Sequence, residues 1–286
     1  MNLEENLLTA IKAAIEAGKE ILKIYDTDFA IERKQDSSPL TLADKKSNEV
    51  INAWLERTGI PELSEEGKHT PFEQRQHWDN LWIIDPLDGT KEFIKRNGEF
   101  TVNIALVKKQ EPILGVIYIP VSGELYFSTK DSGAYKYRSD GNEIGFDHMD
   151  QVRERAMKLP QASRSRPFTV VSSRSHLSRE TEEFVNVLSK DHKEIEYASR
   201  GSSLKLCLIA EGGADIYPRF APTMEWDTAA GQAIVEASGG KVIRHDTGEK
   251  LLYNKEELLN PWFIVYSSTI STSSTSNRNG VSGPIS

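Results

Sequence analysis

The chain has 286 residues, of which 38% are hydrophobic and 27% are charged, and it has one cysteine and a formal net charge of −8. This composition is typical of a globular protein with one large or two modest domains, and it excludes a disulfide framework and a cysteine-rich metal site. The negative charge argues against nucleic-acid binding, and no apolar stretch approaches the ~20 residues of a membrane span. An acidic start without the features of a signal peptide predicts a cytoplasmic protein.

The first half of the chain predicts two helices followed by antiparallel strands. Apolar residues recur at helical spacing over residues 4–25, and a second helix is expected to begin at Thr41 and to end at Gly59-Ile-Pro61. From Leu81 to about Tyr137 the pattern changes to short apolar runs separated by turns. Such a pattern favours an antiparallel meander.

The second half predicts alternating strands and helices. We expect strands at 168–172, 194–197, 214–217, 241–244 and 262–267, and helices at 178–190, 202–211 and 228–237. This alternation favours a mixed or parallel sheet. With the polar stretch 138–161 as boundary, we predict an N-terminal α+β half over residues 1–160 and a C-terminal α/β half over residues 161–267. The Ser- and Thr-rich residues 268–286 predict a disordered tail.

The most informative motif is Asp85-Pro-Leu-Asp-Gly-Thr90, which follows an apolar run typical of a buried strand. Pro86 fixes the backbone between two carboxylates, and Gly89 permits a tight turn with exposed amides. Carboxylate oxygens suit Mg²⁺, which binds a substrate phosphate alongside one or two such ligands, and a helix start favours an anion. The motif alone is equally typical of an Asp-Gly turn that caps a helix.

Two further segments, Leu63-Ser-Glu-Glu-Gly67 and Trp226-Asp-Thr-Ala-Ala-Gly231, accompany this motif. Together the three resemble the lithium-sensitive, magnesium-dependent phosphatase superfamily that includes inositol monophosphatase and fructose-1,6-bisphosphatase. The runs 85–104 and 217–227 resemble its bacterial 3'(2'),5'-bisphosphate nucleotidase branch, and the resemblance covers roughly residues 1–266. It implies an α/β fold (α+β) built as a layered α/β/α/β/α sandwich.

The resemblance implies a site for two or three Mg²⁺ ions. Its metal ligands would be four carboxylates and one backbone carbonyl, namely Glu65, Asp85, Asp88, Asp227 and the Leu87 carbonyl. The residues alone do not decide between Glu65 and the adjacent Glu66, whereas the family motif favours Glu65. By its own pattern Asp227 could equally be the N-cap of the helix at 228–237.

The resemblance also implies catalytic and substrate-binding roles. Asp44 would pair with Thr90 to help deprotonate a metal-bound water, with Glu65 beside them, although Thr41-Leu-Ala-Asp44 by itself is a capping box. The amides of Gly89 and Thr90 would hold the scissile phosphate, and Asp227 would act near the leaving oxygen. Nucleotide contacts are expected from Ser173, His176, Gly201 and Lys205, and Arg219 is a further candidate.

The expected function is therefore a Mg²⁺-dependent phosphatase that converts 3'-phosphoadenosine 5'-phosphate to AMP and phosphate, with 3'-phosphoadenylyl sulfate as a possible second substrate. The expected partner is this bisphosphorylated adenosine nucleotide. The residues fix neither the oligomeric state nor the peripheral inner-membrane association sometimes assigned to this family. Alternatives are an inositol monophosphatase or sugar bisphosphatase on the same core, and a non-catalytic metal- or nucleotide-binding regulatory protein.

Overall fold

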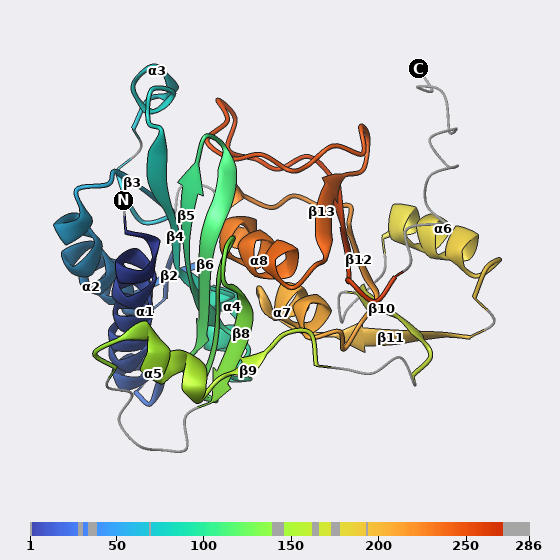
Figure 1. Ribbon diagram of the computed structural model, residues 1–286, viewed down its shortest axis with the longest axis horizontal. Coiled ribbons are helices and arrows are strands. Elements are labelled where there is room, and N and C mark those ends of the chain that lie inside the picture. The colour runs from blue at the N-terminus through green and yellow to red at the C-terminus, as the bar shows by residue number, and fades with distance from the viewer. Residues whose placement is uncertain are drawn as a thin grey trace.

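Five layers of secondary structure follow one another across the molecule, which is the α/β/α/β/α sandwich expected (Figure 1). Helices α1 (Leu3–Tyr25) and α2 (Leu42–Leu55) cover one face of a seven-stranded sheet, and α7 (Leu204–Ala210) and α8 (Glu225–Ala237) cover the other. A five-stranded sheet and then α6 (Arg179–Leu188) complete the stack. The computed structural model describes residues 2–27, 31–33, 39–68, 70–138, 146–161, 166–172, 178–192 and 194–270.

The seven-stranded sheet has the order β3-β4-β5-β6-β7-β8-β9. Its strands are β3 (Glu62–Ser64), β4 (Asn80–Asp88), β5 (Thr101–Lys108), β6 (Glu111–Ile119), β7 (Glu124–Thr129), β8 (Gly133–Arg138) and β9 (Met157–Lys158). The strands from β4 to β8 pair antiparallel in chain order, so the predicted meander is confirmed. Strand β3 was not predicted, because three residues are too few to show a period; it pairs parallel with β4.

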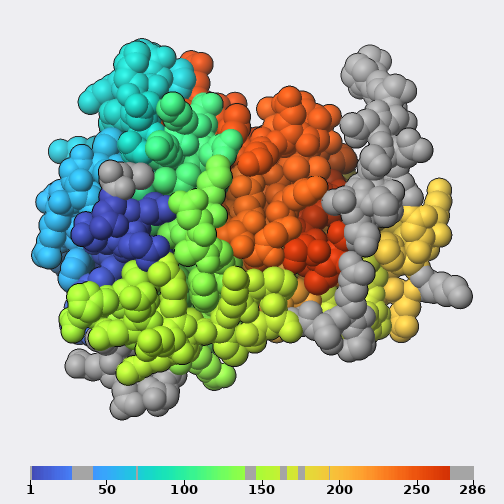
Figure 2. Space-filling model, viewed as in Figure 1, coloured from blue at the N-terminus to red at the C-terminus, as the bar shows by residue number. Residues whose placement is uncertain are grey.

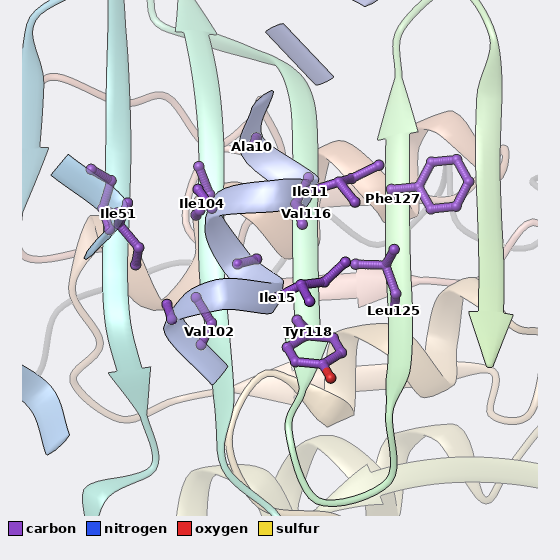
Figure 3. Close-up of a cluster of buried hydrophobic side chains, with 14 of the residues drawn as sticks. Ala10, Ile11, Ile15, Ile51, Val102, Ile104, Val116, Tyr118, Leu125 and Phe127 are labelled. Atoms are coloured by element: carbon purple, nitrogen blue, oxygen red, sulfur yellow. The ribbon is translucent and has the colours of Figure 1, made fainter. Parts of the chain in front are cut away.

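The larger core lies between α1 and the seven-stranded sheet (Figure 3). The helix starts at an N-cap, Asn2, whose side chain accepts from the amides of Glu4 and Glu5. Its apolar face then packs on β5, β6 and β7 through fully buried side chains such as Ile11 and Val116. Each large aliphatic side chain buried in this way contributes about 1.5–3 kcal/mol. The N-terminal half of the chain therefore has its own core.

The five-stranded sheet is mixed, with the order β11-β10-β12-β14-β13. Its strands are β10 (Phe168–Ser172), β11 (Ile195–Ser199), β12 (Ile216–Arg219), β13 (Lys241–Arg244) and β14 (Phe263–Tyr266). The first three run parallel and β14 runs antiparallel to β12 and β13. The predicted strands and helices of this half are confirmed, with ends that shift by a few residues.

Helix α8 lies between the two sheets and is buried over nearly all its length. Its small residues let it approach β6 closely: a Cβ added at Gly115 would lie 2.3 Å from the Ala230 carbonyl oxygen. A larger residue at position 115 would push the helix off the sheet. This close contact holds α8, and Asp227 on its first turn, against the sheet that carries Asp85 and Asp88.

The remaining elements are short. They are β1 (Ile31–Arg33), β2 (Pro39–Thr41), the 3₁₀ helix Glu56–Thr58, α3 (Phe72–Arg75), α4 (Thr90–Ile94) and α5 (Met149–Glu154). Of the predicted tail, residues 268–270 form a turn in which Thr269 donates to Asp215, and residues 271–286 lie outside the described residues. The division at residue 160 stays a prediction. No helix among the described residues is long and apolar enough to span a membrane.

Candidate active site

The end of strand β4 places two carboxylates next to a helix start. The pairing of β4 with β5 shifts register between Asp85 and Asp88, where Pro86 interrupts the ladder. The Asp85 side chain is buried, and its Oδ1 accepts from the Leu87 amide at 3.1 Å. Gly89 follows with φ of +90°, a backbone conformation that favours glycine, and α4 begins at Thr90. The strand therefore ends in a tight turn with both carboxylates close to α4.

Four carboxylates influence one another at this point. Burial raises the pKa of Asp85 well above its usual range, and the charges of Glu65, Asp88 and Asp227 and a hydrogen bond with Glu65 raise it further. Burial and then the charge of Asp88 raise the pKa of Asp227 to about 7, although the Met224 amide and Arg219 oppose this shift. Glu65 is the member of the Glu65-Glu66 pair that acts on both groups. Glu65, Asp85, Asp88 and Asp227 are called the acidic cluster below.

Asp88 is held by three donors that the sequence analysis did not identify. The hydroxyls of Ser202 and Ser203 each donate to its Oδ2 at 2.6 Å, and the Asn103 amide donates to the same oxygen at 3.2 Å. Asn103 is buried in β5, two residues after Thr101, whose hydroxyl contacts Ser202 at 2.7 Å. Polar residues at alternate positions of an apolar strand share one face, and that signal could have marked Thr101 and Asn103.

Asp44 has both roles that the sequence left open. Its Oδ2 accepts from the amide of Thr41 at 2.7 Å and from the Thr41 hydroxyl at 2.6 Å, so it completes a capping box at the start of α2. Its Oδ1 accepts from the Thr90 hydroxyl at 3.3 Å. That hydroxyl also lies 3.5 Å from the Leu87 carbonyl. The α2 capping box therefore orients a carboxylate toward α4.

Asp227 does not precede its helix as expected. Helix α8 begins at Glu225, and Asp227 lies in its first turn, where its Oδ2 accepts from the amide of the N-cap residue, Met224, at 2.9 Å. The prediction was wrong because Met224 is not a residue that caps helices through its side chain. An acidic residue three positions into the helix binds the free amide instead. Asp227 keeps this helix-start contact while its charge lies within reach of Asp88 and Glu65.

A cavity of about 210 Å³ opens beside the acidic cluster. Its lining includes Asp88, Gly89 and Asp227, and Lys205 and Arg219 supply the cations. The Lys205 ammonium donates to the Ser202 carbonyl at 3.2 Å, whereas Arg219 donates to the Pro222 carbonyl and leaves its Nε without a hydrogen-bond partner among the described residues. The cavity therefore combines anion-binding groups with the carboxylates. Its other lining residues are Glu92, Ser202, Ser203, Leu206, Tyr217, Thr223, Thr228 and Phe263.

One residue expected to bind nucleotide, Gly201, is not among those lining the cavity. The Gly201 amide donates to the Glu99 carboxylate at 2.7 Å, and a Cβ at Gly201 would lie 2.8 Å from the Glu92 side chain. Gly201 therefore lets the loop before α7 pack against the segment after α4. Ser173 and His176 lie outside the described residues, so their expected roles stay predictions.

The donor set suits a divalent cation. Hard cations prefer carboxylate and carbonyl oxygens. Burial, and then the neighbouring carboxylates, raise the pKa values of Asp85 and Asp227, so a positive charge between these groups would stabilise their ionised forms. As the side chains stand, no three acidic, imidazole or thiol groups in the described part of the chain are arranged to hold an ion. Asp85, Asp88 and Asp227 accept hydrogen bonds from protein donors instead.

Comparisons with known proteins identify the family of this chain. Residues 2–276 match the model of the inositol monophosphatase family. The chain belongs to the inositol monophosphatase family. Members of this family are metal-dependent.

Similar proteins place the chain within the family. It is 47% identical to the 3'(2'),5'-bisphosphate nucleotidase CysQ of Salmonella typhimurium over 255 residues, which are 87% of this chain and 94% of that protein. The corresponding Escherichia coli K12 protein is 46% identical over the same shares. A crystal structure of CysQ from Bacteroides thetaiotaomicron superimposes with a TM-score of 0.85 at 52% identity, covering 93% of this chain and 98% of that one. A Thermotoga maritima IMPase, at 22% identity and a TM-score of 0.67, shares the fold.

Proposed function

We propose that this chain is a Mg²⁺-dependent 3'(2'),5'-bisphosphate nucleotidase that converts 3'-phosphoadenosine 5'-phosphate to AMP and phosphate and also accepts 3'-phosphoadenylyl sulfate. The observation that carries the proposal is the 47% identity to a 3'(2'),5'-bisphosphate nucleotidase over 94% of its length. The cavity supports it, because Lys205 and Arg219 stand beside the acidic cluster and can bind the phosphate that does not react.

The acidic cluster would hold the cations. We assign two or three Mg²⁺ ions to the carboxylates and the backbone carbonyl named from the sequence, which are Glu65, Asp85, Leu87, Asp88 and Asp227. When bound, the ions would lower the pKa of the attacking water, screen the phosphoryl charge and stabilise the leaving oxygen. Ligating carboxylates must be ionised, so any protons on Asp85 and Asp227 leave when cations bind.

Asp44 and Thr90 would supply the path for the proton of the attacking water. Because the Thr90 hydroxyl donates to Asp44 Oδ1, its own oxygen can accept a hydrogen bond from a water placed between Thr90 and the phosphate. Asp44 stays oriented, since Thr41 holds its other oxygen. The water oxygen would bond to phosphorus as the bond from phosphorus to the ribose 3'-oxygen breaks, and that oxygen would take up a proton from solvent to leave as the 3'-hydroxyl of AMP. Glu65, next to Asp85, would help to orient the water.

The two phosphates of the substrate would have separate binding groups. We assign the scissile 3'-phosphate to the Gly89 and Thr90 amides at the start of α4, next to Asp88. We assign the 5'-phosphate to Lys205 and Arg219, because a cation in a partly enclosed cavity interacts strongly with a phosphate. The rest of the cavity would then be left for the nucleoside. Nucleotide contacts from Gly201, Ser173 and His176, lithium inhibition by competition for a magnesium position, and a cytoplasmic location stay predictions.

Product analysis tests this proposal. The protein is incubated with 3'-phosphoadenosine 5'-phosphate and Mg²⁺ in ¹⁸O-labelled water, and the products are separated and their masses are measured by mass spectrometry. We expect AMP, with one ¹⁸O atom in the released phosphate after a single turnover, as direct attack by water requires. Adenosine 3'-phosphate as product, or no product at all, would contradict the proposal.

A further inference from the structure

A further buried carboxylate, Glu225, lies close in sequence to the acidic cluster but does not belong to it. Glu225 is the first residue of α8, two positions before Asp227, and its side chain is fully buried. Its Oε2 accepts from the Asn254 amide at 2.6 Å, and its Oε1 accepts from the Lys255 amide at 3.0 Å and from the Lys255 ammonium at 2.5 Å. The start of α8 is thereby tied to the loop 254–256.

The same loop is tied to the first half of the chain by a buried arginine. Arg75 ends α3, in the segment that leads into β4, and 3% of it is exposed. Its guanidinium donates to the Asn254 side-chain oxygen and to the Glu256 carbonyl, both at 2.8 Å, and the Asn254 amide group donates back to the Arg75 carbonyl at 2.8 Å. Figure 2 shows these two regions, turquoise and orange, adjoining at the top of the molecule.

Two further contacts carry this connection to Asp227. The Asn260 side chain donates to the Met224 carbonyl at 2.7 Å, while the Met224 amide donates to Asp227 at 2.9 Å. Both polar groups of the Met224 backbone are therefore held, one by Asn260 and one by Asp227 itself. Lys255 also lies 3.5 Å from the Asn260 side-chain oxygen, so the ion pair and the Asn260 contact form one network. A movement of the loop would shift the first turn of α8.

The charges of this network are not explained by stability alone. A buried ion pair often stabilises a fold no better than apolar side chains of the same volume would, because its desolvation offsets the attraction. Charged side chains that make several oriented hydrogen bonds do, however, fix the geometry of the groups they join. Asn254 adopts a left-handed backbone conformation, with φ of +58°, which Asn tolerates better than most residues. The loop is thus held in one arrangement between the two halves of the chain.

We propose that Arg75, Glu225 and Lys255 form a positioning clamp that sets the place of Asp227 relative to Asp85 and Asp88, and thereby the affinity of the acidic cluster for divalent cations. None of the three lines the cavity, so each acts through Asp227 rather than on the substrate. The inference rests on the proposed function only in that the acidic cluster binds a cation. It does not depend on which phosphate ester is hydrolysed.

The test compares two arginine variants by their binding of Mn²⁺, followed by electron paramagnetic resonance without substrate. Arg75→Met breaks the clamp. Arg153→Met is the control, because Arg153 is partly buried and ion-paired, at 2.6 Å to Glu4, but joins α5 to α1 away from the acidic cluster. We expect Arg75→Met to weaken Mn²⁺ binding about 10- to 100-fold, as changes behind a metal ligand do, and the control to stay within about twofold of the parent.

Kinetics and a conservative variant separate positioning from general destabilisation. Well below the unfolding temperature, Arg75→Met should lower kcat and raise the Mg²⁺ concentration for half-maximal rate, while KM for 3'-phosphoadenosine 5'-phosphate changes by less than about threefold. Arg75→Lys should recover part of the Mn²⁺ affinity, since it restores the charge without the two-pronged contact. Lys255→Met should weaken Mn²⁺ binding in the same way. Because Lys255 is partly exposed, this variant is less prone to misfold and replaces Arg75→Met if the latter does not fold.

Two results overturn the proposal. One is an Arg75→Met protein whose unfolding temperature is lowered but whose Mn²⁺ affinity stays within about twofold of the parent. Where Lys255→Met replaces this variant, the same result in Lys255→Met counts against the proposal. The other is a parent protein that binds no Mn²⁺. A parent that binds Mn²⁺ but does not hydrolyse the nucleotide would contradict the proposed function instead, and Mn²⁺ binding would still test the clamp.

Discussion

Replacing Asp227 by Asn should stabilise the metal-free protein at alkaline pH. The Asp227 carboxyl is partly buried among like charges, and these surroundings raise its pKa from 3.8 to about 7. Asn has the same shape and no charge, and its side-chain oxygen can still accept from the Met224 amide, as Asp227 does at 2.9 Å. The substitution therefore removes the repulsion and keeps the helix-start contact.

The size of this stabilisation and its pH dependence follow from the pKa values of Asp227 in the unfolded and folded states. A carboxyl whose pKa is raised by folding leaves stability intact below its unfolded pKa, here 3.8, and reduces stability as pH rises toward the folded value of about 7. Each pKa unit corresponds to about 1.4 kcal/mol, so a rise of about three units sets an upper limit of about 4 kcal/mol. Because the carboxyl keeps some contact with solvent, we expect a gain of about 2–4 kcal/mol in the free energy of unfolding at about pH 8.

Urea unfolding in the presence of EDTA measures this gain. We expect the difference between Asp227→Asn and the parent to vanish near pH 4 and to reach its full value above pH 7. Asp246→Asn is a control with the same change in net charge, and it should not stabilise, because Arg244 holds the pKa of Asp246 below its usual value. An Asp227→Asn protein less stable than the parent at alkaline pH would refute the reasoning.

Excess Mg²⁺ should reverse the order of stability. A ligand that binds only the folded state stabilises in proportion to the logarithm of its concentration over its dissociation constant, and only the parent keeps the full ligand set. We therefore expect Mg²⁺ to raise the unfolding temperature of the parent more than that of Asp227→Asn. Equal shifts in the two proteins would show that Asp227 does not contact the cation.

Three further substitutions test other parts of the account. Asp88→Asn should abolish phosphate release while circular dichroism shows a largely intact fold, because it removes a proposed cation ligand and no core packing. Lys205→Ala should raise KM for 3'-phosphoadenosine 5'-phosphate about 10- to 100-fold in steady-state assays, with less effect on a simple phosphate monoester, because a charge-assisted contact is lost. Burial and the Glu56 charge raise the pKa of Glu62 to about 7. In urea unfolding, Glu62→Gln should therefore stabilise the protein near pH 8 and have no effect near pH 4. Because Glu62 is partly exposed, we expect a gain of only about 1 kcal/mol. Near-normal turnover in Asp88→Asn, equal effects of Lys205→Ala on both substrates, or a pH-independent effect of Glu62→Gln would each contradict the corresponding argument.

The fold could be predicted where local sequence determines it. Helix α1 repeats its apolar positions over many turns and was predicted close to its observed ends, and the strands from β4 to β8 are separated by clear turns and were predicted as one antiparallel meander. Long-range contacts determine the rest. Strand β3 pairs in parallel with β4, and the Met224 carbonyl at the start of α8 accepts a hydrogen bond from Asn260, which is distant in sequence. No local pattern contains either contact.

The candidate site was predictable from motifs, but its supporting contacts were not. The local sequence of residues 85–90 predicts a carboxylate-rich turn. The prediction that Asp227 and Lys205 belong to the same site depended on the family resemblance. The structure brings Asp227 and Lys205 to the same cavity as Asp88. Ser202 and Ser203 bind Asp88 across more than a hundred residues of sequence, and small polar residues of this kind occur throughout the chain. Their role follows only from the three-dimensional arrangement.

Phosphate release from 3'-phosphoadenosine 5'-phosphate and from inositol 1-phosphate, compared in Mg²⁺ with and without Li⁺, would decide whether the chain is a bisphosphate nucleotidase. We expect a strong preference for the nucleotide and loss of release in Li⁺. A preference for the inositol ester would keep the acidic cluster as the catalytic centre and contradict the assigned substrate, and no release from either would favour a regulatory protein that binds metal or nucleotide.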